Sequence, residues 1–173
     1  MTRSQLHPLP AYFDRYINKT DDVDVATALE TGLAELDLAP IGDWERIGDR
    51  VYMPGKWMVK DILQHLIDTE RIFSYRATAF ARGDANVPSY DEATYGHRAA
   101  AARRTLGDLH DELMALRRST IHQFLSFTQE MLQCQGNGFK GPYAVHDIGF
   151  IIPGHQRWHF GIIKQRYLPL VGG

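Results

Sequence analysis

Residues 154–169 read GHQRWHFGIIKQRYLP, and this stretch decides the fold prediction because its histidines fall on an apolar helical face. His155 and His159 are four residues apart, so a helix places both on one face with Cβ atoms about 5–6 Å apart. They are in phase with Ile148 and Ile152, which belong to an inward-facing apolar stripe. A buried imidazole without a partner costs about 1–3 kcal/mol. A divalent cation bound by both rings would satisfy them together.

Apolar residues at three- and four-residue steps predict long helices along the rest of the chain. The expected ranges are 21–38, 57–82, 99–132 and 143–167. Residues 84–97 are predicted to form a long polar loop, and the glycine-rich residues 133–142 a turn. No alternating strand pattern is evident. The sequence therefore predicts an all-α four-helix bundle, one domain over residues 1–173, with a metal site in the bundle core.

The composition is that of an ordinary soluble globular protein. Of the 173 residues, 44% are hydrophobic and 23% charged, which is enough for one domain with a hydrophobic core. The net charge of −2 gives no global attraction to nucleic acid or to an anionic membrane, so neither is an expected partner. No apolar membrane span or signal peptide is evident. Cys134 is the single cysteine, which excludes an internal disulfide, and the expected location is the cytoplasm.

A third metal ligand is needed, and His65 is the candidate. It lies in the predicted helix over 57–82, beside Ile62 and Leu66. A lone histidine there is more often a hydrogen-bonded core residue, but the inward-facing histidine pair favours a ligand. Three neutral imidazoles bind a divalent cation at about 2.0–2.1 Å and leave a fourth position for water or substrate. A zinc-protease motif is absent, because Gln156 follows the first histidine of the pair.

Two segments far apart in the sequence carry distinctive motifs. The first is PGKWMVKDILQHLIDTERIFSYRATAFARGD, with Gly-Lys-Trp before a helix that carries His-Leu-x-Asp-x-Glu-Arg. The second is residues 154–169, with Gly-His, a further histidine and an Arg-Tyr-Leu ending. The residues of these motifs are Gly55, Lys56, Trp57, His65, Leu66, Asp68, Glu70, Arg71, Gly154, His155, His159, Arg166, Tyr167 and Leu168. Together they resemble the paired signatures of the DinB-like (DinB/YfiT) family of metal-binding bundles, although Trp158 replaces the first histidine of the family's usual His-His pair.

This resemblance implies a four-helix bundle that holds a divalent metal through His65, His155 and His159. Imidazole suits zinc and nickel, which are the expected metals, with manganese and iron as alternatives. Several relatives use low-molecular-weight thiols as co-substrates, and others are described as metal-dependent hydrolases. The resemblance therefore implies a metal-dependent enzyme that carries out either thiol-dependent transfer or hydrolysis. The alternative is a non-enzymatic, stress-related bundle whose metal site is vestigial or structural.

Asp68 is the predicted catalytic residue. It lies three residues after His65, so it could orient an imidazole or accept a proton. A structural ion pair with Arg71 or Arg166 is the alternative.

Tyr90, Asp91 and Tyr95 are predicted to bind substrate at the mouth of the pocket, although solvated loop residues have the same pattern. The expected partner is a small-molecule substrate, with a low-molecular-weight thiol as one candidate. Homodimer formation is left open by the sequence.

Two other features give structural expectations. The arginine pairs at 103–104 and 117–118 are predicted to mark the solvated face of the third helix. Pro153 cannot donate a hydrogen bond to the carbonyl of Gly149, so a bend is predicted just before His155.

Overall fold

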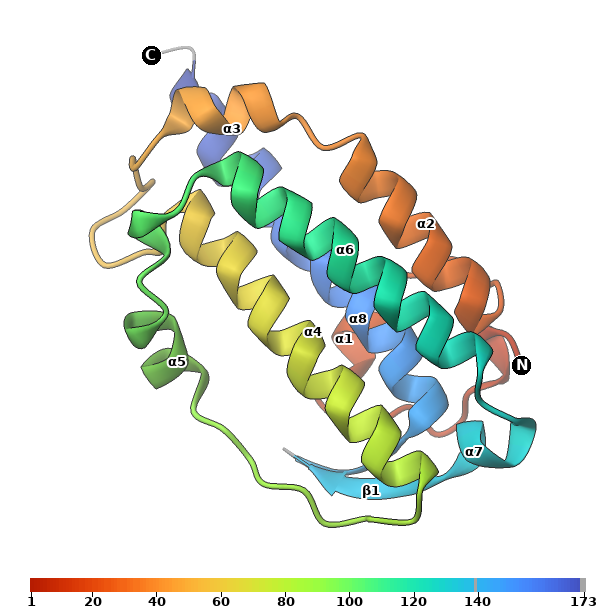
Figure 1. Ribbon diagram of the computed structural model, residues 1–173. Coiled ribbons are helices and arrows are strands. Elements are labelled where there is room, and N and C mark those ends of the chain that lie inside the picture. The colour runs from red at the N-terminus through yellow and green to blue at the C-terminus, as the bar shows by residue number, and fades with distance from the viewer. Residues whose placement is uncertain (139, 172–173) are drawn as a thin grey trace.

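The computed structural model describes residues 1–138 and 140–171 and shows a four-helix bundle (Figure 1). The four long helices are α2 (Val25–Asp37), α4 (Val59–Ala81), α6 (Leu106–Leu125) and α8 (Val145–Ile162). Helices α4 and α2 each pack against both α6 and α8, so they lie on opposite corners of the bundle. Within the described residues, no helix combines the length and apolar character that crossing a membrane requires.

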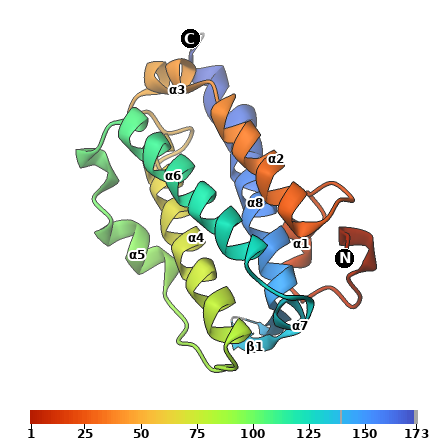
Figure 2. The ribbon, with the colours of Figure 1, turned by 45° about the vertical axis from the view of Figure 1, so that its right-hand side comes forward.

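Shorter elements surround this bundle. They are α1 (Asp14–Ile17), α3 (Ile41–Ile47), α5 (Glu92–Arg98), α7 (Gln129–Gln133), β1 (Gln135–Gly138), β2 (Gly141–Ala144), 3₁₀ turns at Arg3–Gln5, Ala101–Arg103 and Leu168–Val171, and a π-helical turn at Ile163–Tyr167. Helix α1 packs on α8, and α5 lies on the outer side of α4 (Figure 2). These two short helices therefore flank the two long helices that carry the histidines.

The predicted third helix over 99–132 is wrong in extent. Thr105 accepts a hydrogen bond from the backbone N–H of Asp108 at 3.0 Å, and this N-cap starts α6. Thr128 caps α7 in the same way through the N–H of Met131 at 3.3 Å. A capping hydroxyl satisfies backbone donors that would otherwise have no partner, so it fixes where a helix begins. The predicted helices over 21–38 and 57–82 need only small corrections at their ends.

The glycine-rich segment predicted to be a turn contains an antiparallel hairpin. Strands β1 and β2 pair in a register that runs from Gln135 opposite Ala144 to Gly138 opposite Gly141. Tyr143 on β2 is buried, and its ring packs against Phe80 with centroids 5.5 Å apart. The hairpin thus closes the end of the bundle at the last turns of α4. Helix α8 continues through Pro153, and the bend predicted there stays a prediction.

Buried polar residues divide the core into two apolar clusters. One cluster includes Phe73, Ile121 and Ile152, and the other includes Leu66, Leu113 and Ile163. On α4, α6 and α8 the boundary between the clusters falls at polar side chains. We call these residues the polar layer; they are Glu70, Arg117, His155 and Gln156.

The polar layer is held by an ion pair with two hydrogen bonds. Arg117 donates from Nε and Nη2 to the two carboxylate oxygens of Glu70, both at 2.9 Å. Gly32 on α2 leaves room for this guanidinium, because a Cβ atom there would overlap it. The Gly32 carbonyl accepts a hydrogen bond from Gln156 Nε2 at 2.9 Å. Arg117 is 1% exposed, so its predicted place on the solvated face is wrong, whereas Arg118 is exposed.

Replacing Arg117 with methionine is expected to destabilise the metal-free protein by about 3–5 kcal/mol, because it leaves the Glu70 carboxylate buried without a partner. The double change Arg117→Met with Glu70→Leu should recover part of that loss, since it removes both charges. Denaturant unfolding measures both effects. Arg118→Met is the matched control and should change stability by less than about 0.5 kcal/mol. If Arg117→Met and Arg118→Met lowered the stability by the same amount, this account of the polar layer would be contradicted.

Candidate metal centre and pocket

Three histidine side chains meet between α4 and α8. The Nε2 atoms of His65 and His155 are 3.1 Å apart, and those of His155 and His159 are 3.0 Å apart. One ligand atom from each ring lies within 4.8 Å of the other two. His65 and His155 are buried and His159 is partly buried. The structure therefore brings together the three residues that the sequence singled out as metal ligands.

Local packing explains why these rings converge. His155 and His159 are one turn apart on α8, and α8 packs directly on α4, which carries His65. Gly154 lets α1 approach α8 closely, because a Cβ atom at that position would overlap the carbonyl group of Tyr16. This approach brings the Tyr16 ring against His155, with centroids 4.9 Å apart. His155 is thus held between α1 and α4.

The nitrogen geometry fits a shared cation better than hydrogen bonds among the rings. His155 Nε2 is within 3.1 Å of two other ring nitrogens. A neutral ring nitrogen carries either one N–H or one lone pair in its plane, so it cannot form good hydrogen bonds to both neighbours. A tetrahedral ion with bonds of about 2.0–2.1 Å would hold its ligand atoms about 3.3 Å apart. The observed separations are close to that value, and the three residues fit a divalent metal.

A hydroxyl chain supports His65 from its other nitrogen. Thr69 Oγ1 is 3.3 Å from His65 Nδ1, and the Tyr90 hydroxyl is 3.2 Å from the same Thr69 oxygen. A partner on the second ring nitrogen fixes which nitrogen faces a metal and how the ring is turned. Among the described residues, His159 Nδ1 is buried without such a partner.

Burial lowers the pKa of all three imidazoles. Desolvation, with a contribution from His159, lowers the pKa of His65 from 6.5 to about 3. Desolvation lowers the pKa of His159 from 6.5 to about 4. The pKa of His155 is well below 6.5, because that ring is desolvated and lies beside the other two. The three rings are therefore neutral at pH 7, which is the form that binds a metal.

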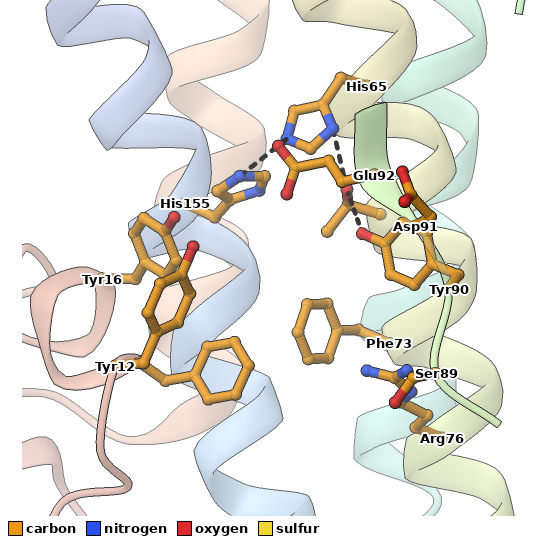
Figure 3. A pocket seen from close by; sticks show the side chains of 12 residues that line it. Tyr12, Tyr16, His65, Phe73, Arg76, Ser89, Tyr90, Asp91, Glu92 and His155 are labelled. Carbon is orange, nitrogen blue, oxygen red and sulfur yellow. Dashed lines mark hydrogen bonds and ion pairs between the residues drawn. The ribbon is translucent and has the colours of Figure 1, made fainter. Parts of the chain in front are cut away.

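A cavity of about 310 Å³ opens beside the histidines (Figure 3). Residues from α1 and the turn before it, from α4 and α8, and from the start of α5 and the segment before it form its wall. They are Tyr12, Phe13, Tyr16, His65, Thr69, Phe73, Arg76, Ser89, Tyr90, Asp91, Glu92 and His155. Five of these twelve residues are phenylalanine or tyrosine, and aromatic rings with a few polar groups are usual in a small-molecule site.

Glu92 supplies the carboxylate nearest to the histidines. Its Oε1 atom is 3.8 Å from His65 Nε2, and Figure 3 shows the side chain reaching from α5 toward that ring. Desolvation, with a contribution from Asp91, raises the pKa of the Glu92 carboxyl. The sequence interpretation did not identify Glu92. Its position in the first turn of α5, directly after the predicted binding residues, is the signal that could have found it.

The structure does not bring Asp68 to the pocket. Its carboxylate accepts a hydrogen bond from Gln64 Nε2 at 2.9 Å, and Gln64 is in turn bonded to Arg104. Desolvation raises the pKa of Asp68. Asp68 and Thr69 both lie within about one helical turn of His65, but only the Thr69 side chain contacts the His65 ring. The catalytic role predicted for Asp68 stays a prediction without a contact to support it.

The three predicted binding residues take different positions. Tyr90 and Asp91 line the cavity. The Asp91 carboxylate also caps α5 through the N–H of Thr94 at 2.7 Å. Tyr95 lies outside the cavity wall and packs on the Tyr90 ring with centroids 5.1 Å apart. Their roles in binding stay predictions.

The chain matches one family of known proteins in sequence and one solved structure in fold. The model of the DinB superfamily matches residues 34–163. Among solved structures, the chain is similar to YfiT from Bacillus subtilis, which is described as a probable metal-dependent hydrolase with an unusual four-helix bundle topology. The TM-score is 0.61 at 14% identity, over 92% of this chain and 85% of that chain. This likeness shows a shared fold. No curated protein gives a significant match.

The metal-free protein is expected to lose stability as the pH falls from about 6.5 to about 4. The unfolded chain binds protons at histidines below its pKa of 6.5, whereas the folded chain keeps His65 and His159 neutral down to about 3 and about 4. Each such histidine should contribute a slope of about 1.4 kcal/mol per pH unit across that window. Denaturant unfolding at several pH values measures the slope.

His159→Gln should make this slope shallower, because one of the neutral rings is removed. His97→Gln is the matched control, since His97 is exposed, and it should leave the slope unchanged. Identical slopes in the wild type and in His159→Gln would show that burial does not depress the pKa of this ring.

Proposed function

Since the chain belongs to the DinB superfamily, we propose that it is a metal-dependent enzyme that acts on a small molecule in the cavity beside α4 and α8. His65, His155 and His159 would hold the metal, with zinc and nickel as the first candidates and manganese and iron as alternatives. The observation that supports this proposal is the convergence of three neutral ring nitrogens next to an open cavity. The description of YfiT as a probable metal-dependent hydrolase agrees with it.

The chemistry divides between the metal and the chain. A bound dication supplies a Lewis acid and lowers the pKa of a water or thiol that it binds. Glu92 is placed to accept the proton of that nucleophile, because its carboxylate faces His65 and its raised pKa is nearer to neutrality than that of an ordinary glutamate. Thr69 and Tyr90 keep the His65 ring oriented. The phenylalanine and tyrosine rings of the wall would pack against an apolar part of the substrate.

Two reactions are compatible with this arrangement. In hydrolysis the nucleophile is water, and in thiol-dependent transfer it is a low-molecular-weight thiol that enters the cavity with the second substrate. The cavity beside the histidines favours either enzyme over the alternative of a non-enzymatic bundle with a structural metal site, because a structural site is usually closed by a fourth protein ligand. Homodimer formation stays a prediction.

The purified protein is expected to bind about one divalent ion per chain. His155→Ala or His159→Ala should sharply reduce that content, because two imidazoles alone rarely hold a metal. Elemental analysis after dialysis measures the stoichiometry. His97→Ala and His122→Ala are the controls, since both residues are exposed and should not matter. An unchanged metal content in both triad variants would refute the assignment.

Cobalt loading is expected to separate the two reactions. If the enzyme uses a thiol, adding glutathione, bacillithiol or mycothiol to the cobalt-loaded protein should produce a sulfur-to-cobalt charge-transfer band, because a dication with three neutral ligands stabilises a thiolate. Absorption spectroscopy detects the band. A spectrum that none of these thiols perturbs would exclude thiol transfer with these partners and favour hydrolysis.

A further inference from the structure

Arg76 is a buried cation at the end of the cavity opposite the histidines. Its side chain is 2% exposed and lines the cavity, and Figure 3 shows it on the far side of Phe73 from His65 and His155. It donates from Nη1 to the Tyr143 hydroxyl at 3.0 Å and from Nη2 to the carbonyl of Pro88 at 3.1 Å. Its Nε atom is buried and has no partner among the described residues.

No carboxylate within the described residues forms an ion pair with Arg76. Its contacts are two neutral oxygens and the rings of Phe73 and Tyr90, whose centroids lie 5.6 and 5.8 Å from Cζ. Arg117, the other buried arginine of the bundle, has Glu70 as its counterion. Burying a guanidinium without a negative partner is costly, so a protein rarely keeps one without a use for it.

The helical period puts Arg76 on the same face of α4 as the metal ligand. Steps of four, four and three residues lead from His65 through Thr69 and Phe73 to Arg76, and all four side chains line the cavity. The Cα atoms of His65 and Arg76 are three helical turns apart, which is a rise of about 16 Å along α4. The long side chain of Arg76 makes the distance from its guanidinium to His65 shorter than that rise. A ligand that reaches both ends must therefore carry its charge several bonds away from its reacting group.

We propose that Arg76 binds the carboxylate of the substrate, and that the substrate is a small monocarboxylic acid with an apolar body whose reactive group lies at the three histidines. This inference names the substrate class of the proposed enzyme and so rests on that function. The free Nε–H and an Nη–H of Arg76 can engage both oxygens of a carboxylate. Phe13, Phe73 and Tyr90 provide an aromatic wall for the apolar body.

The charges around the cavity favour a single negative charge on the ligand. Among the described residues of the wall, Arg76 is the only lysine or arginine, and the carboxylates of Asp91 and Glu92 also belong to the wall. One guanidinium matches the single charge of a carboxylate, whereas it would balance only half of the charge of a dianionic phosphate. The cavity volume of about 310 Å³ is at the low end of the about 300–1,000 Å³ of ligand sites, which fits a molecule with one ring or a short chain.

Binding of 3-phenylpropionate to the metal-free protein tests this proposal. The probe carries one ring and one carboxylate, and 3-phenylpropionamide is its uncharged counterpart of nearly the same shape. Metal-free protein is used so that a bond between the carboxylate and a metal cannot produce the signal. Calorimetry or ring-proton NMR should show at least tenfold tighter binding of the acid than of the amide.

Arg76→Gln should reduce this preference for the acid to less than about threefold. Arg82→Gln is the matched control, because Arg82 is an exposed arginine directly after the last residue of the same helix, and it should keep the full preference. Arg76→Lys, which retains the charge, should keep part of it if Arg76→Gln proves unstable. In the wild type the acid, and not the amide, should also raise the melting temperature.

Equal binding of acid and amide by the wild type, or an unchanged preference in Arg76→Gln, would overturn the proposal. Metal content measured on the same variants distinguishes a failure of this inference from a failure of the proposed function. Arg76→Gln should retain one metal per chain, because Arg76 lies at the other end of the cavity. Loss of the preference for the acid with the metal retained supports a carboxylate site at Arg76.

Discussion

Midway along the bundle, Glu70 and Arg117 form an ion pair through two hydrogen bonds with almost no contact with solvent. Two charges are tolerated at such a place only when their geometry is close to ideal, so this pair holds α4 and α6 at one relative height. Gly32 makes room for the guanidinium, so α2 packs against this ion pair. Gln156 on α8 donates a hydrogen bond to the Gly32 carbonyl, which links α8 to α2. His155 precedes Gln156 and is therefore fixed at the height where it faces His65. The metal centre depends on this packing as much as on its own three rings.

The long helices could be predicted from the sequence because burial along a helix leaves a regular pattern. The apolar stripe over 57–82 gave α4 to within two residues at either end. The starts of α6 and α7 were missed because they depend on the hydroxyls of Thr105 and Thr128, whose capping role competes with helical apolar residues on both sides. The hairpin of β1 and β2 was read as a turn, since four-residue strands rich in glycine have no alternating pattern.

The site was predictable where a short spacing determines it, and not where tertiary packing does. His155 and His159 follow from one helical turn, and His65 from the need for a third ligand and from the family resemblance. Glu92 and Arg76 were missed, because Glu92 reaches the histidines only through the way α5 lies on α4. Arg76 looks like any charged residue of a helix until the structure shows that it is buried without a counterion. Asp68 was named for its closeness in sequence to His65, but its side chain turns toward Gln64.

X-ray absorption spectroscopy of the zinc-loaded protein tests the central claim most directly, because it reports the atoms bonded to the metal. The account predicts three imidazole nitrogens at about 2.0–2.1 Å and at least one further light ligand that is not a protein sulfur. The multiple-scattering signal of imidazole should weaken by about a third in His65→Ala if that variant retains any metal. A shell of oxygen atoms alone, or a sulfur ligand from Cys134, would contradict the assignment of His65, His155 and His159.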